Sequence, residues 1–533
     1  MVPERLRSAL ALLVVLGVAL FCALRPIGEL DVFWHLAVGR WIVQHHTLPQ
    51  VNVWSAADPG QAYHPSQWLW DTAAALLDER GGLGAVRLAN AAWITASFVL
   101  AYVLLRRGDS VAVSLLLTLV LLAAFQDRVR VRPHVINLAG EVLLTYFVAR
   151  YTTLRRTHLL LALLGFLLWS SLHAGGAWIA MLMLAAVSLF GVVWERVLCK
   201  TCERREGLLL VALSCCVGWL LSPGSIAWFG VHDDAAMIVA EEWRAWPALV
   251  AAPGWQRLPH VILVRAFMPL AIVAWVAVAL RWRKITAADS KLRDALGTPR
   301  ELAWAALCIA LSCFAWRFFY FAALALIALR MGWRRLGATA GVVEPTPSRA
   351  SVLVPLCGAA LLGVLSAYAE CLEYPSYAEA WGSRSETVDD RYLPVLGTQI
   401  LVESRLDARV ATLPDWGGYV IYAGWPKLRT TIDGRYTAPE DVRAITRQLE
   451  DIFNTGRNVD ALPELYDKLP ADFVLMPRRR YTARLPLLNW TKVATGAVED
   501  LYIRKVPGST EWIETLRLVI ERHRLTGIPN HVQ

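Results

Sequence analysis

Charged residues are scarce in this sequence. Only 18% of its 533 residues are charged, while 56% are hydrophobic and the mean hydropathy is +0.43. Soluble globular proteins contain roughly 25% charged and 45–50% apolar residues. A core of ordinary size cannot hold all the apolar side chains of this chain, which excludes a typical water-soluble globule. The composition instead predicts a membrane protein.

The cysteines of this sequence give little support for a metal site and exclude a disulfide in the tail. Most of the nine cysteines lie in apolar runs, and only Cys199 and Cys202 form a CxxC pair. One such pair without a second pair or a histidine partner is a weak signal for zinc. No cysteine follows Cys371, so the hydrophilic tail cannot contain a disulfide. The net charge of +9 comes from short basic clusters between apolar runs, and no nucleic-acid-binding motif accompanies them. The sequence therefore gives no indication of nucleic-acid binding.

Long apolar runs recur through the first 371 residues. The run Ser8–Leu24 is not followed by a small-x-small cleavage site, so we expect it to be retained as a helix. Together with it, the other runs predict about eleven transmembrane helices, several of them short for a bilayer about 30 Å thick. The other runs lie near residues 83–105, 110–126, 134–149, 158–172, 174–194, 207–222, 260–280, 301–316, 318–331 and 350–370.

Lysine and arginine gather in alternate connections between these runs, which predicts that those connections are cytoplasmic. The loop 25–82, the loop 223–259 and the tail would then lie outside. A single helix across 301–331 would bury Arg317 within the bilayer at a cost of about 2.5–3.5 kcal/mol. We therefore expect a hairpin with Arg317 at the outer surface. The predicted division is a transmembrane domain, 1–371, that includes the outer loop 25–82, and an extracytoplasmic domain, 372–533.

The tail has the pattern of a small α/β domain. Short runs rich in β-branched and aromatic residues predict five strands, and longer periodic runs predict two helices, the first after a candidate cap at Thr437. The predicted strands are Arg409–Leu413, Arg429–Ile432, Asp472–Met476, Trp490–Ala494 and Leu501–Lys505. The predicted helices are Pro439–Phe453 and Glu511–Arg524.

Polar residues collect on the predicted outer face. A carboxylate there can act as a general base on an acceptor hydroxyl or amine, and guanidinium groups can bind a phosphate leaving group. Alternatively, each such residue is only solvated or reaches the lipid headgroups, and Asp31 is only a helix N-cap. The residues concerned are Asp31, His35 and His64 in the first outer loop, then Arg128, Arg130, Arg132, His134, His173, Glu241, Glu242 and Arg317.

These residues stand within motifs that resemble the bacterial polytopic proteins of the GT-C glycosyltransferase superfamily. The similarity covers nearly the whole chain, with its motifs in the same order. The motifs begin with the run Asp31-Val32-Phe33-Trp34-His35-Leu36, followed by Leu48-Pro49, Trp68-Leu69, Arg132-Pro133-His134, Leu172-His173-Ala174-Gly175, Ser222-Pro223-Gly224, Glu242-Trp243, Arg317-Phe318, Trp416-Gly417-Gly418-Tyr419 and Asp433-Gly434-Arg435-Tyr436.

The resemblance implies a multi-pass enzyme of the bacterial inner membrane with an extracytoplasmic C-terminal domain. Such an enzyme would transfer a sugar, with inversion, from a polyprenyl-phosphate donor to a lipid, glycan or protein acceptor on the outer face. The catalytic base of the superfamily matches Asp31, and we expect Glu242 to assist in catalysis or to have an orienting role. We expect Arg130, Arg132, His134, His173 and Arg317 to bind the donor phosphate. A divalent metal is possible, because members of the superfamily differ in this respect.

The remaining motif residues have less defined expectations. The motif around Trp416 and Tyr419 is similar to a signature in the soluble domain of oligosaccharyltransferases, while its residues alone predict a turn that glycine permits. We expect Arg435 either to pair with Asp433 or to reach towards the membrane site. His35 is a further candidate.

Two other functions remain open. The relatives usually have other polar residues at Asn52, Ser66 and Gln67, which favours a non-catalytic envelope scaffold. A flippase for lipid-linked glycans would need paired ionisable groups near the bilayer midplane, for which Glu141 is the main candidate.

Overall fold

The structure is a computed structural model in which the chain forms two compact units. Unit 1 comprises residues 1–25 and 87–385, and unit 2 comprises residues 26–86 and 386–533. The residues that the structure describes are 3–151, 153–196, 207–225, 259–288, 296, 298–341, 349–371, 382, 387–435, 437–479, 482, 488–507 and 509–525. The predicted boundary after residue 371 assigns the outer loop to the transmembrane domain, whereas the structure groups residues 26–86 with the tail.

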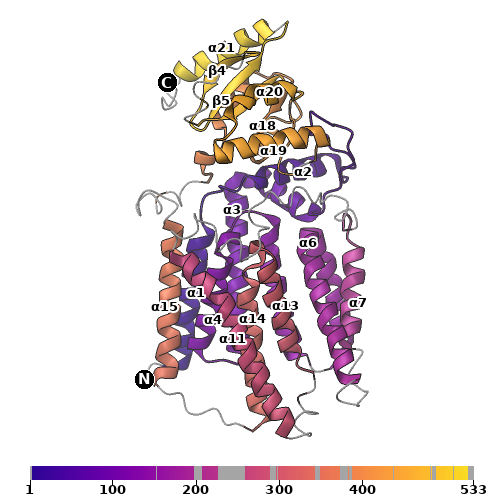
Figure 1. Cartoon of the computed structure of the whole chain (residues 1–533), viewed down its shortest axis with the longest axis vertical. Helices are drawn as coiled ribbons and strands as arrows, with labels where there is room; N and C mark the ends of the chain where they lie inside the picture. The colour runs from indigo at the N-terminus through magenta and orange to yellow at the C-terminus, as the bar shows by residue number, and fades with distance from the viewer. Residues whose placement is uncertain are drawn as a thin grey trace. The chain divides into compact units, whose positions relative to one another are not determined.

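Unit 1 is helical (Figure 1). Within the described ranges, six helices of the chain are long and apolar enough to cross a membrane, compared with the expected number of about eleven. The difference arises partly because α5, α7 and α13 have only 14 or 15 residues each. The helices of unit 1 are α1 (Glu4–Ala23), the second part of α3 (Trp68–Arg106), α4 (Val111–Phe125), α5 (Ile136–Arg150), α6 (Arg156–Trp194), α7 (Gly207–Leu220), α11 (Pro259–Ala288), α13 (Arg300–Phe314), α14 (Phe321–Thr339) and α15 (Arg349–Cys371).

Helix α6 is broken at His173, where the backbone leaves the helical region with φ −160° and ψ 89°. The second half of α6 runs antiparallel to α7. At one end the Trp219 indole donates to the carbonyl oxygen of Ala174 at 3.1 Å, and at the other end Ser188 Oγ donates to the carbonyl oxygen of Leu208 at 3.3 Å.

The first half of α6 runs parallel to α7 and therefore antiparallel to the second half. Ser171 Oγ lies 2.9 Å from Ser222 Oγ, just past the end of α7. A Cβ atom on Gly218 would lie 2.2 Å from the carbonyl oxygen of Leu163. The runs 158–172 and 174–194, predicted as separate helices, are thus the two arms of a hairpin with His173 at its tip, and both arms contact α7 (Figure 1).

Helices α13 and α14 form a second hairpin, as the sequence predicted for residues 301–331. Near the open end, Arg335 Nη2 donates to Glu301 Oε2 at 2.7 Å. At the closed end, Ser312 Oγ donates to the carbonyl oxygen of Phe318 at 3.3 Å. Arg317 lies in the 3₁₀ turn Trp316–Phe318 that joins the helices, so the turn carries the charge instead of a helix interior.

Unit 2 contains a five-stranded mixed sheet with the order β2-β1-β3-β5-β4. The first three strands in this order are parallel, and β5 and β4 are antiparallel to their neighbours. Every residue of the central strand β3 is buried, as expected for a strand covered on both faces. The strands are β1 (Ala408–Ala411), β2 (Leu428–Thr430), β3 (Phe473–Pro477), β4 (Trp490–Thr495) and β5 (Glu499–Arg504).

Helices cover both faces of this sheet. One core forms between α19, α20 and one face, with Val474 and Met476 from β3. The other core forms between α17, α18, α21 and the opposite face, with Phe473 and Leu475 from the same strand. The helices of unit 2 are α2 (Asp31–His45), the first part of α3, α17 (Val395–Glu403), α18 (Pro414–Gly424), α19 (Glu440–Thr455), α20 (Leu462–Lys468) and α21 (Ser509–Leu525).

The outer loop is part of this fold. Residue Ile27 forms a parallel bridge with Val388, and Ser55 forms one with Thr430 at the end of β2. The Ala56 amide also donates to the carbonyl oxygen of Thr430 at 2.7 Å. Backbone hydrogen bonds therefore join segments from the two ends of the sequence.

The five predicted strands and two predicted helices of the tail are confirmed within a few residues. Helices α17, α18 and α20 were not predicted, because each is short. The predicted cap at Thr437 is wrong, since Pro439 precedes α19 and the Thr437 hydroxyl instead accepts a hydrogen bond from Asn52.

The close contact at Gly218 leads to a first prediction. Gly218→Ala places a methyl group against the α6 backbone and is expected to lower the free energy of unfolding by about 1–3 kcal/mol. The matched control is Gly165→Ala, in the same pair of helices, where a Cβ atom meets nothing within 4 Å. Denaturation of both variants in detergent measures the difference, and equal stability of the two would contradict the tight packing of α6 on α7.

Candidate functional site

Asp31 is the first residue of α2 in unit 2, and the turn around Gly434 packs directly against it. Leu30 occupies the N-cap position, so Asp31 is not the cap. A Cβ atom on Gly434 would lie 2.3 Å from Asp31 Oδ1 and 3.2 Å from the Trp34 indole. Only glycine leaves room for the carboxylate here, and the turn therefore fixes where Asp31 lies.

The Trp416–Tyr419 motif brings α18 against the start of α2. The expected turn is wrong, since these residues lie within α18. A Cβ atom on Gly418 would lie 3.1 Å from the Trp34 amide nitrogen. The Trp416 indole donates to the carbonyl oxygen of Tyr392 at 2.8 Å, and the Tyr419 ring packs edge-on against Phe33 with centroids 5.0 Å apart. The motif's aromatic residues anchor the helix that supports Asp31.

Arg435 pairs with Asp433, which confirms one of the two expectations for it. Arg435 Nε donates to Asp433 Oδ1 at 2.8 Å, and a second bond joins Nη2 to Oδ2. The two side chains are only 2% and 3% exposed. Burial alone would lower the pKa of Arg435, but Asp433 raises it above its ordinary value, so the guanidinium stays charged.

The outer loop completes the surroundings of Arg435. The guanidinium lies over the rings of Trp54 and Tyr63, at 4.7 and 4.8 Å from their centroids. Burial raises the pKa of the Tyr63 phenol, so that it stays neutral. Asn52 Oδ1 accepts from Arg435 at 3.3 Å and from the Trp54 amide at 3.2 Å. Asn52 therefore has a structural role in this chain.

His35 faces the interior of unit 2. Its Nδ1 lies 2.6 Å from Asp71 Oδ1, and the side chains are 3% and 0% exposed. The imidazole also stacks on Trp34, with ring centroids 3.5 Å apart. Sequence reasoning missed Asp71, because nothing in the local sequence Trp68–Asp71 marks it as buried beside a histidine. The Asp71 carboxylate and the Trp34 ring thus hold the His35 imidazole in the interior of unit 2.

Unit 1 gathers most of the expected phosphate-binding residues into one group, which we call the basic cluster: Arg128, Arg132, His134, His173 and Arg317. His134 Nε2 hydrogen-bonds to the carbonyl oxygen of Arg128 at 2.8 Å, and Arg132 and His173 act on the same imidazole electrostatically. Arg128 and Arg317 both act on Tyr320. The Tyr320 ring, just after the turn that carries Arg317, packs edge-on against Phe125 at the end of α4 with centroids 4.9 Å apart, so both hairpin tips lie near the turn between α4 and α5.

Two further residues near the basic cluster are Arg130, which was expected to bind the donor phosphate, and Glu141. The side chain of Arg130 is exposed and donates to the carbonyl oxygen of Asp127 at 3.0 Å. Glu141 is buried, and the Tyr320 hydroxyl donates to its Oε1 at 2.9 Å. Because Arg128 also acts on Glu141, this carboxyl group belongs to the surroundings of the basic cluster.

His173 also has a role in the backbone. Its Nδ1 accepts a hydrogen bond from the Gly176 amide at 3.0 Å, which caps the second half of α6. In the neutral imidazole this leaves Nε2 as the protonated nitrogen.

Glu242 lies outside the described residues. Among the residues that the structure does describe, no three His, Cys, Asp or Glu side chains gather as a metal site would require.

Comparison with known proteins gives matches by structure. No family model and no curated protein matches the sequence. The Archaeoglobus fulgidus oligosaccharyltransferase in its apo form has a TM-score of 0.52 at 12% identity, covering 87% of this chain and 69% of that chain. AglB from Archaeoglobus fulgidus, in complex with an inhibitory peptide and a dolichol-phosphate, has a TM-score of 0.51 at 13% identity with the same coverage.

A third structure extends over nearly all of both chains. ArnT from Cupriavidus metallidurans bound to undecaprenyl phosphate covers 93% of this chain and 97% of that chain, at 13% identity and a TM-score of 0.41. Identities this low establish a shared fold alone. The chain therefore shares the fold of the Archaeoglobus fulgidus oligosaccharyltransferase, which agrees with the fold that the sequence resemblance predicts.

The buried Asp433–Arg435 pair leads to a second prediction. Arg435→Met leaves Asp433 buried and unpaired and is expected to lower the free energy of unfolding by about 3–5 kcal/mol. Adding Asp433→Leu is expected to recover much of this loss, so the double variant is more stable than the sum of the single effects predicts. Unfolding of the full chain in detergent measures all three variants. Unchanged stability in Arg435→Met would mean that Arg435 does not hold the turn.

Proposed function

We propose that this protein transfers a sugar from a polyprenyl-phosphate donor to an acceptor on the outer face of the bacterial inner membrane. The observation that carries the proposal is an apolar groove of about 700 Å³ in unit 1, lined mainly by α5 and the first half of α6. A polyprenyl phosphate needs an apolar groove for its chain and cationic side chains at the end of that groove for its phosphate.

One end of the groove adjoins the basic cluster. Ile136 and Leu172 both line the groove, and they lie next to the turn that carries His134 and next to His173, respectively. Between the ends, the groove follows α5, whose 15 residues span about 22 Å. The groove can therefore hold the first isoprene units of a carrier whose phosphate lies at the basic cluster.

The proposed reaction is a single displacement at the anomeric carbon of the donor sugar. Asp31 accepts the proton of the acceptor hydroxyl or amine while the new bond to the anomeric carbon forms. The bond from that carbon to the phosphate oxygen breaks, and polyprenyl phosphate leaves. Arg132, His173 and Arg317 stabilise the negative charge that develops on the leaving phosphate. Attack opposite the leaving group inverts the anomeric configuration.

The fold agrees with this chemistry. AglB, whose fold this chain shares, is an oligosaccharyltransferase whose structure holds a dolichol-phosphate. The acceptor is a lipid, glycan or protein, and Glu242 has an assisting or orienting role. Trp416 and Tyr419 hold α18 in place for Asp31.

The proposed base gives a third prediction. Asp31→Asn removes the proton acceptor and keeps the size of the side chain, so the transfer rate is expected to fall about 10²- to 10⁴-fold. The protein level and membrane insertion are expected to stay normal, because Asp31 is not the helix cap. Transfer at the normal rate in this variant would reject Asp31 as the base.

The experiment that tests the function compares a deletion strain complemented with wild type or with Asp31→Asn. Mass spectrometry of lipid-linked sugars and envelope glycans is expected to show one accumulated polyprenyl-phosphate sugar and one lost glycan modification, rescued by wild type alone. No glycan difference, or equal rescue by both forms, would favour the envelope scaffold. Accumulation of the donor on the cytoplasmic side alone would favour the flippase.

The groove gives a fourth prediction. Gly165 lines it, and a Cβ atom there meets nothing within 4 Å. Gly165→Phe fills the groove and is expected to raise KM for the lipid-linked donor about tenfold, as the loss of roughly two buried CH₂ groups of the carrier would do. The control is Gly17→Phe in α1, a glycine equally open to its surroundings but outside the groove. Equal KM values in both variants would contradict donor binding in the groove.

A further inference from the structure

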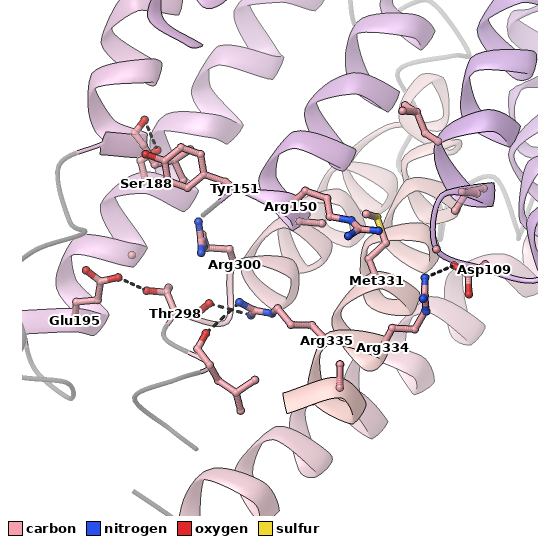
Figure 2. A pocket seen from close by; sticks show the side chains of 18 residues that line it. Asp109, Arg150, Tyr151, Ser188, Glu195, Thr298, Arg300, Met331, Arg334 and Arg335 are labelled. Atoms are coloured by element: carbon pink, nitrogen blue, oxygen red, sulfur yellow. Dashed lines mark hydrogen bonds and ion pairs between the residues drawn. The ribbon is translucent and has the colours of Figure 1, made fainter. Parts of the chain in front are cut away.

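A second pocket lies at the opposite end of the unit 1 helices from the basic cluster. Its volume is about 430 Å³. It lies near the open end of the α13–α14 hairpin, and residues at the C-terminal end of α5 also line it. Figure 2 shows Tyr151, Arg300 and Glu195 on one side of the pocket and Arg150 and Arg334 on the other. We call it the arginine pocket. Arg150 and Tyr151 line both this pocket and the far end of the apolar groove, but no other described residue of the pocket lines the groove.

Two pairs of guanidinium groups converge on this pocket. A Cβ atom on Gly108 would lie 1.9 Å from Arg334 Nη1 and 3.1 Å from Arg150 Nη2, so these two side chains meet at Gly108. Arg300 and Arg335 are close enough to act on each other electrostatically. Like charges held together at the edge of an apolar bundle repel each other, and an anion between them would remove the repulsion.

The nearby carboxylates do not balance these cations. Asp109 is bound by Arg330 at 2.6 Å and lies 3.7 Å from Arg334. Arg335 pairs with Glu301 at 2.7 Å. Glu195 accepts from Thr298 at 2.8 Å, and both Glu195 and Glu301 act on Arg300 electrostatically without forming an ion pair with it. Within the described parts of the chain, Arg150 and Arg300 form no ion pair with a carboxylate, which leaves an excess of about two positive charges.

Unused hydrogen-bonding groups lie at the same place. Tyr151 is 7% exposed, and its hydroxyl has no hydrogen-bond partner among the described residues. The buried Nε of Arg335 also has none there. Buried polar groups without partners are rare in folded proteins, and a bound ligand with acceptor oxygens would satisfy both.

We propose that the arginine pocket binds the phosphate group of an anionic phospholipid. Phosphate oxygens suit guanidinium and phenol donors, and the charge of one or two phosphates matches Arg150 and Arg300. Leu104, Leu105 and Leu296 also line the pocket, so it offers an apolar wall to the rest of a lipid. It lies at the end of the bundle where arginines gather, and basic pockets between transmembrane helices on the predicted cytoplasmic side commonly bind anionic headgroups.

Native mass spectrometry of the purified full-length protein in detergent tests the proposal. Wild type is expected to retain phosphatidylglycerol in preference to phosphatidylcholine, and inorganic phosphate at the same concentration is expected not to displace it. Arg150→Gln and Arg300→Gln are each expected to weaken phosphatidylglycerol binding about fivefold. Arg156→Gln, an exposed arginine at the same end that does not line the pocket, is expected to bind as wild type does.

Three results would overturn the proposal. They are equal retention of the two lipids by wild type, undiminished binding in the double variant Arg150→Gln/Arg300→Gln, and displacement by inorganic phosphate, which would identify a free-phosphate site instead. Arg300→Lys keeps the charge and is expected to retain binding. Binding by Arg300→Lys but not by Arg300→Gln would show that the lost charge, and not misfolding, weakens binding. If the Gln variants do not fold, the wild type still tests the idea, since its preference for phosphatidylglycerol must fall as salt concentration rises.

Discussion

The buried Arg435 guanidinium is the interaction on which the fold of unit 2 depends. A charge removed from water is destabilising unless it is paired, and Arg435 is paired with Asp433, donates to Asn52 and lies over the rings of Trp54 and Tyr63. Asn52 and Arg435 are 383 positions apart in the sequence. The requirement to satisfy one guanidinium therefore ties the first outer loop to the tail, and the same turn brings Gly434 against Asp31.

In unit 1, the position of polar groups follows from where helices end or break. The break at His173 and the turn at Arg317 each place a cationic side chain at the tip of a hairpin. Backbone groups at such ends also need partners, and His173 supplies one to Gly176. The basic cluster is thus a consequence of helix termination as much as of residue type.

Both ends of unit 1 carry arginine, but its partners differ. Near the basic cluster, Tyr320 and Glu141 form a buried hydrogen bond among the cations. At the arginine pocket, the carboxylates are already bound, and guanidinium groups face one another. The ligands proposed for the two ends follow this difference. A reacting phosphate suits the end that adjoins an apolar groove, and a resident lipid phosphate suits the end with excess positive charge.

The sequence by itself determined the membrane class, the hairpin at Arg317, the strands of the tail and the resemblance to the GT-C fold. These features depend on hydrophobic periodicity, on charge placement and on the order of motifs, all of which are local or additive along the chain. It did not show that Trp416–Tyr419 is helical, because its glycines are explained only by the close approach of α2.

Only the tertiary structure decided which buried polar side chains form pairs. Asp71 beside His35, Glu141 beside Tyr320 and Asn52 beside Arg435 have no local signature, since each pair joins distant segments. The grouping of the outer loop with the tail has the same origin. Burial and pairing of charge are properties of the folded surroundings, and a sequence pattern cannot encode which distant side chain will satisfy a buried group.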